Sequence, residues 1–332
     1  MLIAALVLLS GCTFSLGADG PSVDPGGEEP AWSGDEDNPY RQERLVVAID
    51  GSANDSREYA PLVREALDYW EANSKRYAGY PIEYELDPDA TDPDIRVQFV
   101  DAVEQCGTET HAAGCAPVIA EPGQFDPPVE VSVRTGFSDN STVQVLEHEL
   151  GHTLGLHHSD EPRKVMAASS ALTTPPQKNV TDRALPWQSE TLSVYVDMSE
   201  IPADERDEAR RQVDGALGYF GEGAGGTVPE NVSFVRTDNE SAADITVRAT
   251  AESPCSTSSG SCGYLLGTDP DGDGAREWYT RLEITVTDLD TEAIGWHVGR
   301  WLGVGFGLEG EEYPEPLRDS ASYSERRSDW WE

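Results

Sequence analysis

The segment from His148 to His158 constrains this chain more than any other, because its sequence is His-Glu-Leu-Gly-His-Thr-Leu-Gly-Leu-His-His. His148 and His152 are four residues apart, so a helix places both imidazoles on one face, where they can bind one metal ion. Gly155 can take the φ > 0 conformation that ends a helix and reverses the chain. The reversal returns His158 as a third nitrogen ligand, which leaves a fourth position on a zinc ion open for water.

Glu149 follows His148 on the same helix and is expected to face the open side of the metal. Zinc lowers the pKa of a bound water from near 16 to about 7 and stabilises an oxyanion. A carboxylate beside that water can take its proton during attack on a carbonyl and pass the proton to the leaving amine. The segment therefore predicts one catalytic zinc ion with Glu149 as the general base.

These residues form the pattern His-Glu-x-x-His-x-x-Gly-x-x-His, which resembles the metzincin clan of zinc peptidases. Met166, eight residues beyond His158, matches the Met-turn of the matrixin branch, and Ser159 directly after the third histidine is also similar to matrixins. The resemblance implies a metalloendopeptidase acting on a protein or peptide substrate, with Met166 as an apolar floor under the metal. It also implies a zincin-like α+β fold, with a twisted mixed sheet above the cleft and the active-site helix below. The substrate would align with the edge strand of the sheet.

The resemblance covers about residues 44–189, which we assign as the peptidase domain. Ala167 and Ala168 follow the methionine where matrixins usually have Tyr-Pro, so the wall of the S1′ pocket is not carried over. A calcium ion is possible, but the sequence does not support one. The acidic segment from Asp269 to Gly274 resembles the start of a calcium loop, but Thr280 stands where the glutamate at loop position twelve is required. An acidic turn is the favoured interpretation.

Residues 190–320 resemble a second, degenerate copy of the first domain. Asp-Ile-Thr-Val at 244–247 repeats Asp-Ile-Arg-Val at 94–97, and Gly-Arg-Trp-Leu-Gly-Val at 299–304 repeats Gly-His-Thr-Leu-Gly-Leu at 151–156. In that alignment the three ligands and the glutamate are replaced, so we expect the fold without the metal. The replacements, in chain order, are Trp296, His297, Arg300 and Phe306. An unrelated domain with chance similarity is the alternative.

The amino terminus predicts export. Residues 2–9 are an apolar run too short to span a bilayer, and Leu-Ser-Gly-Cys at 9–12 resembles a lipobox, although no basic residues precede it. We therefore assign residues 1–12 as a signal, with Cys12 lipidated and the protein anchored to the outer face of the cytoplasmic membrane. An ordinary signal peptide and full secretion is the alternative. Residues 13–43 are rich in Gly, Pro and acids and predict a flexible linker.

The other cysteines form two local pairs, Cys106 with Cys115 and Cys255 with Cys262. Close pairs in an exported protein predict disulfides that staple loops. A structural zinc site is the alternative, but neither pair shows the doubled Cys-x-x-Cys spacing of such sites.

The charge balance excludes some partners. The chain has 62 Asp and Glu against 23 Lys and Arg, a formal net charge of −39. This surface repels nucleic acid and anionic lipid, so no nucleic acid partner is expected and the membrane is reached only through the lipid. Acids spread over the whole chain favour adaptation to high salt over an acidic ligand-binding face.

Two further histidines are not expected to bind the metal: His157 should point away from it, and His111 in the Cys106–Cys115 loop should lie on the surface. Two other functions stay open beside the peptidase. The chain could be a non-catalytic surface binding protein built on two zincin-like scaffolds. Alternatively, the second domain could regulate the first, with Trp296, Trp301 and Phe306 filling its former cleft. Residues 321–332 are assigned as a tail.

Overall fold

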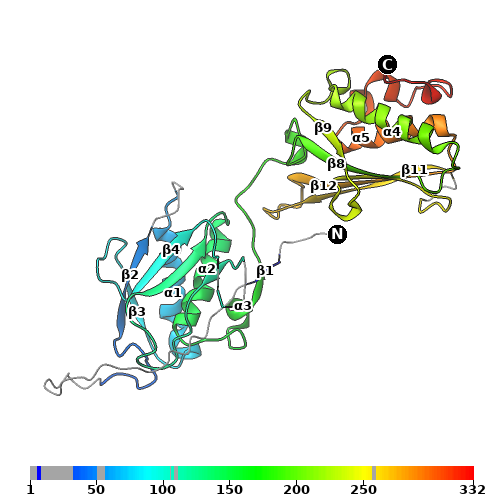
Figure 1. The fold of residues 1–332 in the computed structure, drawn as a ribbon. Helices are drawn as coiled ribbons and strands as arrows, with labels where there is room; N and C mark the ends of the chain where they lie inside the picture. The colour runs from blue at the N-terminus through cyan, green and yellow to red at the C-terminus, as the bar shows by residue number, and fades with distance from the viewer. Residues whose placement is uncertain (1–5, 9–32, 51–56, 105, 108–110, 256–258) are drawn as a thin grey trace. The chain divides into compact units, whose positions relative to one another are not determined.

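The computed structural model describes residues 6–8, 33–50, 57–104, 106–107, 111–255 and 259–332. The proposed lipid site Cys12 and most of the expected linker lie outside the described residues. The chain divides into two compact units between Pro176 and Gln177 (Figure 1). Within the described residues, no helix has both the length and the apolar character needed to cross a membrane.

The first unit is built on a five-stranded sheet with the order β3-β2-β4-β6-β5. The first four strands run parallel, and β5 pairs antiparallel with β6 at the edge. Strand β4 shows the expected alternation, because Ile95, Val97 and Phe99 are fully buried. The strand bounds are β2 Arg44–Asp50, β3 Glu83–Leu86, β4 Ile95–Val100, β5 Gly114–Cys115 and β6 Val129–Arg134. A separate antiparallel pair joins β1 Leu6–Leu8 to β7 Ser169–Ala171.

Two long helices cover this sheet, α1 (Ala60–Tyr77) and α2 (Asp139–Thr153), followed by the short α3 (Arg163–Met166). Helix α1 buries Leu62, Val63, Ala66, Leu67 and Trp70, which recur at helical spacing. The indole N–H of Trp70 donates to the backbone oxygen of Glu147 at 2.7 Å, which joins α1 to α2. Ser138 caps α2 by accepting from the Ser141 N–H at 3.3 Å.

The expected linker is shorter than its assigned range of 13–43. Asn38 is 1% exposed and Tyr40 is 9% exposed, so both belong to the folded unit. The hydroxyl of Tyr40 donates to the backbone oxygen of Thr153 at 2.8 Å, at the end of α2. The first unit therefore begins before residue 44.

The second unit repeats the plan of the first, which confirms the predicted second domain of similar fold. Its sheet has the order β11-β12-β10-β8-β9, with parallel pairing throughout except for the antiparallel edge strand β11. Two long helices, α4 and α5, again pack on each other. The bounds are β8 Thr191–Asp197, α4 Arg206–Gly221, β9 Ser233–Arg236, β10 Ile245–Ala249, β11 Gly260–Thr268, β12 Trp278–Thr287 and α5 Ile294–Gly305.

Single turns of 3-10 helix connect these elements: η1 Val180–Asp182, η2 Ala224–Gly226, η3 Glu240–Ala242, η4 Thr291–Ala293, η5 Gly310–Glu312, η6 Glu315–Leu317 and η7 Glu325–Arg327.

Both ends of the second unit differ from the sequence assignment. It begins at Gln177 rather than 190, because Val180 N–H donates to the Arg276 backbone oxygen at 2.7 Å and Trp187 is buried in the second core. The segment 321–332 is not a loose tail, since Trp330 is 8% exposed and packs within that same core.

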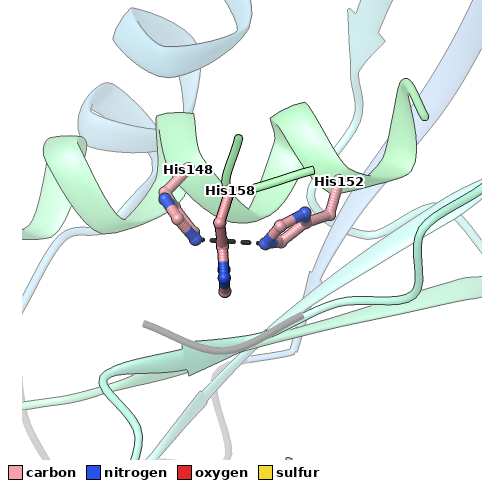
Figure 2. Close-up of side chains that lie close together, drawn as sticks. All are labelled: His148, His152 and His158. Atoms are coloured by element: carbon pink, nitrogen blue, oxygen red, sulfur yellow. Dashed lines mark hydrogen bonds between the residues drawn. The ribbon is translucent and has the colours of Figure 1, made fainter. Parts of the chain in front are cut away.

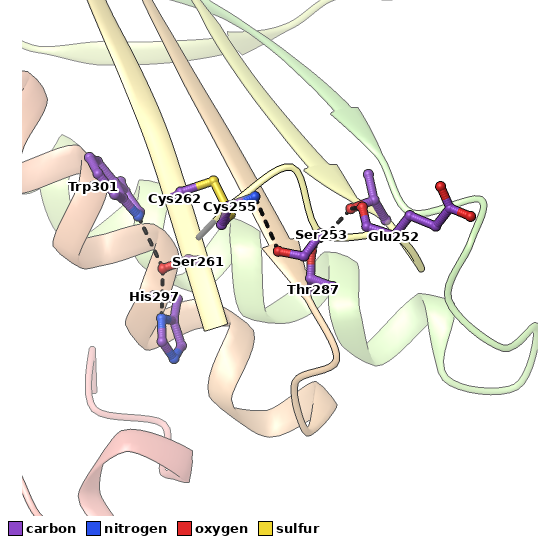
Figure 3. The surroundings of a disulfide bond; sticks show 9 residues. Glu252, Ser253, Cys255, Ser261, Cys262, Thr287, His297 and Trp301 are labelled. Carbon is purple, nitrogen blue, oxygen red and sulfur yellow. Dashed lines mark hydrogen bonds between the residues drawn. A yellow bond between two sulfur atoms is a disulfide. The ribbon is translucent and has the colours of Figure 1, made fainter. Parts of the chain in front are cut away.

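Both predicted disulfides are present, Cys106–Cys115 and Cys255–Cys262. The second joins the edge strand β11 to the loop before it (Figure 3). Next to Cys262, the Ser261 hydroxyl accepts from the indole N–H of Trp301 at 3.0 Å and lies 2.8 Å from Nδ1 of His297.

Candidate metal centre

Helix α2 carries two of the three predicted ligands on its inner face. His148 and His152 are 0% and 1% exposed, and their ring centroids lie 4.7 Å apart. His158 approaches from the segment after the helix, with its ring 5.1 Å from His148 and 5.0 Å from His152. One nitrogen from each of the three rings can be chosen so that all lie within 4.8 Å of one another (Figure 2). The fold thus brings together the three residues singled out by spacing.

Backbone carbonyls fix the orientation of the two helical imidazoles. The Nδ1 of His148 lies 2.7 Å from the Val165 oxygen, and the Nδ1 of His152 lies 2.7 Å from the Leu156 oxygen. Because a carbonyl oxygen can only accept, both Nδ1 atoms must carry the proton and donate. Both Nε2 atoms therefore present lone pairs toward the centre of the site.

The two Nε2 atoms lie 3.1 Å apart (Figure 2). In these tautomers neither can donate to the other, so two lone pairs face each other in a buried site. A zinc ion with nitrogen ligands at about 2.0–2.1 Å in tetrahedral geometry separates its nitrogens by about 3.3 Å. The residues present therefore fit zinc, whose positive charge would turn this facing pair of lone pairs into two metal–ligand bonds.

The turn after α2 positions the third ligand. Gly155 has φ +89°, in the left-handed region, and a Cβ at this position would lie 3.0 Å from the Ile119 backbone oxygen. The Leu156 N–H donates back to the Gly151 oxygen at 3.1 Å, which closes the helix end. This same turn presents the Leu156 oxygen that orients His152, so one local structure serves two ligands.

Met166, the predicted methionine floor, is fully buried and lies close to Gly151 of α2. A Cβ at Gly151, between the two helical ligands, would come within 2.5 Å of the Met166 sulfur and 2.8 Å of the Trp70 ring. Glycine at 151 therefore permits the close approach of Met166, a role that the motif alone did not indicate.

Glu149 is fully buried between α2 and the edge strand β5. A Cβ at Gly114 on β5 would come within 2.6 Å of its Oε1 atom. Burial raises the pKa of the Glu149 carboxyl well above its usual value, and the backbone N–H of Ala116 opposes that rise. Sequence reasoning missed Gly114, whose only signal was its place beside Cys115.

Burial makes the helical ligands neutral at physiological pH. Desolvation, with the nearby His152, lowers the pKa of His148 to about 3. Desolvation likewise lowers the pKa of His152 to about 4, although the Leu156 carbonyl favours its protonated form. Neutral imidazole is the form that binds a metal, so ligation needs no proton release from these rings.

The other predicted residues are not members of the three-histidine group. His157 and Ser159 are exposed, and the His157 backbone N–H donates to the Asp160 carboxylate at 2.7 Å. His111 is also exposed, with φ +67°. Ala167 follows directly on the short helix α3 that ends at Met166.

The end of α5 corrects the alignment of the second unit. In the first unit Gly155 and Leu156 close α2. In the second, Gly307 has φ +76°, and Leu308 N–H donates to the Gly303 oxygen at 2.9 Å. Gly303, which the sequence aligned with Gly155, lies inside the helix.

The counterparts of the site therefore shift by one turn. When the two helices are aligned by their C-terminal ends, the counterparts are Arg300 for His148, Trp301 for Glu149, Val304 for His152 and Gly310 for His158. The edge strands agree, because a Cβ at Gly263 of β11 would meet Trp301 at 2.9 Å, as one at Gly114 would meet Glu149. Neither alignment assembles three metal ligands in the second unit.

A sheet with an antiparallel edge strand, above a helix bearing two histidines that converge with a third, defines a zincin-type zinc peptidase domain. The family model described as Matrixin, a peptidase family, matches residues 40–183 of this chain. The match begins at Tyr40, in agreement with the burial of that residue.

Solved structures that resemble the chain include two of myroilysin. The first is 17% identical and covers 35% of this chain and 48% of the myroilysin chain, with a TM-score of 0.21. The second is 19% identical and covers 43% of this chain and 60% of the myroilysin chain, also with a TM-score of 0.21. The matched part spans less than two thirds of either myroilysin chain.

Proposed function

We propose that the protein is a zinc-dependent endopeptidase that hydrolyses peptide bonds of extracellular proteins, with Glu149 as its general base. The observation that carries this proposal is the pair of Nε2 lone pairs, 3.1 Å apart, on His148 and His152, with His158 beside them. Their arrangement suits a metal ion and leaves the tautomers no hydrogen bond between the two rings.

Each residue has one task in this mechanism. His148, His152 and His158 hold the ion, which when bound supplies Lewis acidity toward water and the substrate carbonyl. Glu149 takes the proton of the attacking water on a carboxylate oxygen and delivers it to the departing amide nitrogen. The raised pKa of the buried Glu149 carboxyl suits a group that must both accept and return a proton.

The edge strand β5 is the proposed docking place for the substrate backbone. It lies at the end of the sheet, and its Gly114 packs directly on the Glu149 side chain. A peptide added along this edge by β-augmentation would pass over the proposed base.

The decisive experiment measures metal content and cleavage of a mixed peptide library by the full chain in concentrated salt. We expect one zinc per chain, cleavage that chelator abolishes, and loss of about 10²–10⁴-fold in rate for Glu149→Gln with zinc retained. Glu147→Gln, two positions before Glu149 and half-buried, is the matched control and should keep most activity.

The alternative is a surface binding protein that uses two zincin-like scaffolds. A folded protein that takes up no zinc would favour this alternative. Zinc uptake with equal cleavage by wild type and Glu149→Gln would instead remove Glu149 from its role as base.

For location, we propose that the protein is anchored outside the cytoplasmic membrane by a lipid on Cys12. The support is the Leu-Ser-Gly-Cys segment at 9–12 after an apolar run. Cys12→Ser should release the protein from the membrane fraction, and metabolic labelling with a fatty acid should depend on Cys12. The anchor would be contradicted if Cys12→Ser stayed in the membrane fraction and the wild type took up no labelled fatty acid.

The acidic surface is proposed to adapt the protein to high salt, supported by the net charge of −39. The folded state should gain stability as salt rises, because counter-ions screen the repulsion between carboxylates. Circular dichroism during thermal unfolding at increasing KCl tests this. A melting temperature independent of KCl would contradict it.

A further inference from the structure

The hairpin between β11 and β12 gathers four carboxylates that the proposed peptidase chemistry does not use. Asp269, Asp271 and Asp273 lie in the loop, and Glu277 directly precedes β12. One carboxylate oxygen from each can be chosen so that all four lie within 4.8 Å of one another. This group belongs entirely to the second unit, outside the stretch matched by the matrixin family.

The burial of Glu277 distinguishes this group from an ordinary acidic turn. It is 0% exposed, and neither of its carboxylate oxygens has a hydrogen-bond partner among the described residues. Its carboxylate points into the group formed by the three aspartates. Among the ion pairs between described residues, none involves any of these four carboxylates. An ionised buried carboxylate beside three others is unfavourable unless a cation neutralises the charge, and otherwise the group tends to hold a proton.

Backbone N–H groups fix the three aspartates in place. Asp269 accepts from Gly272 and Gly274 at 2.8 and 3.0 Å, and Asp273 accepts from Ala275 at 2.7 Å. Asp271 accepts from the Gln177 N–H at 2.8 Å through one oxygen. These bonds hold the carboxylates in one arrangement while leaving further lone pairs for a cation.

We propose that Asp269, Asp271, Asp273 and Glu277 bind a calcium ion. The aspartates occupy positions one, three and five of a calcium loop, and Glu277 provides at position nine the carboxylate that such loops usually take from position twelve. Calcium takes six to eight oxygen ligands in flexible geometry, which carboxylates with added water can supply. Zinc prefers nitrogen and sulfur donors, and magnesium requires a near-ideal octahedron, so neither suits this set as well.

The ion would fasten the first segment of the second unit. Gln177 N–H donates to the Asp271 carboxylate, and Val180 N–H donates to the Arg276 oxygen at 2.7 Å. These two hydrogen bonds therefore attach residues 177–180 to the loop that would hold the ion. Calcium binding should protect this segment from added protease and raise the melting temperature of the second unit.

The test uses the full chain, freed of metal by chelator and returned to buffer, with calcium alone as the probe. Calorimetric titration should give a saturable site, and the unfolding temperature should rise with calcium more than with equal magnesium. Tb³⁺ gives an independent signal, because Trp278 follows Glu277 and can sensitise its luminescence, which calcium should then quench by competition.

Glu277→Gln keeps the shape and removes the charge. It should weaken calcium binding by about tenfold or more. Without calcium it should unfold at the same or a higher temperature than wild type, because a buried unpaired charge is gone. A purely structural glutamate would give the opposite result, with loss of stability in both conditions.

Two controls separate this site from the histidine centre. Glu222→Gln, the same change at an exposed position of the second unit, should leave calcium binding unaltered. His148→Gln, which removes a proposed zinc ligand, should leave it unaltered too. Absence of a calcium-dependent shift in wild type, or equal calcium binding by Glu277→Gln, would overturn the proposal whatever the peptidase assay shows.

Discussion

Gly114 and Glu149 are packed so closely that a Cβ at position 114 would lie 2.6 Å from Oε1 of Glu149 and 2.7 Å from its Cγ. The edge strand and the proposed base are therefore fitted to each other, and the fit depends on the absence of a side chain. Any larger residue at 114 must displace either the strand or the carboxylate.

Gly114→Ala should lower peptidase activity by about a hundredfold while zinc content stays unchanged. The reason is geometric, since a displacement of about 1 Å in a catalytic group costs about that much. Steady-state rates and metal analysis on the same sample check this. Gly218→Ala is the control, because a Cβ there meets nothing within 4 Å. Full activity of Gly114→Ala would show that the strand yields instead of Glu149.

Gly155→Ala should weaken zinc binding, because the left-handed turn that returns His158 becomes strained and the new Cβ approaches the Ile119 oxygen. Gly136→Ala is the matched control, with φ +87° but open space around the new atom. Both variants should lose about 1 kcal/mol or more of stability from backbone strain. Only Gly155→Ala should need more free zinc for half-saturation in a competition titration. Equal zinc affinities would contradict the role of the turn.

The buried Glu149 carboxyl should make the stability of the metal-free protein depend on pH. Burial raises the pKa of its carboxyl in the folded state above the unfolded value of 4.5. The stability that this group contributes is therefore complete below pH 4.5 and is lost as pH rises. Glu149→Gln does not suffer that loss, so its advantage over wild type should grow between pH 5 and pH 8.

Urea unfolding of the chelated proteins at fixed salt measures this difference. Glu121→Gln, at an exposed position, should show no growing advantage. If Glu149→Gln were more stable than wild type by the same free energy of unfolding at pH 5 and at pH 8, the wild-type carboxylate would have to be stabilised without metal.

The two units should unfold independently, because each has its own core and the chain divides between Pro176 and Gln177. A chain of residues 33–176 should fold and keep zinc binding and peptidase activity at the level of the full protein. Calorimetry should give two transitions for the full chain and one for the fragment. A large change in rate or specificity on truncation would support regulation by the second unit.

The sequence was sufficient where function depends on local spacing. His148, His152 and the turn at Gly155 follow from helix periodicity and glycine chemistry, and the alternation in Ile95–Val100 predicts a strand. Local spacing does not reveal contacts between distant segments. Gly114 is adjacent to Glu149 only because β5 folds over α2.

The same limit applies to two other features. Glu277 was not considered because the calcium-loop pattern demands a glutamate at position twelve, whereas Glu277 stands at position nine and is buried. Gly303 was aligned with Gly155 because the residues around them are similar, yet of Gly303 and Gly307 it is Gly307 that takes the left-handed conformation. Helix ends are set by backbone conformation, and the same residue type can take different conformations at two aligned positions.

The one-turn shift between the sequence alignment and the backbone alignment of α5 with α2 bears on any attempt to engineer a second active centre into this chain. Grafting histidines at 296, 300 and 306, as the sequence alignment suggests, would leave the last of them at the helix end rather than beyond a reversal. A graft guided by the backbone would instead use Arg300→His, Trp301→Glu, Val304→His and Gly310→His. Trp301 then becomes the critical exchange, since its indole donates to Ser261 of the edge strand and lies against Gly263, where the new glutamate would have to fit.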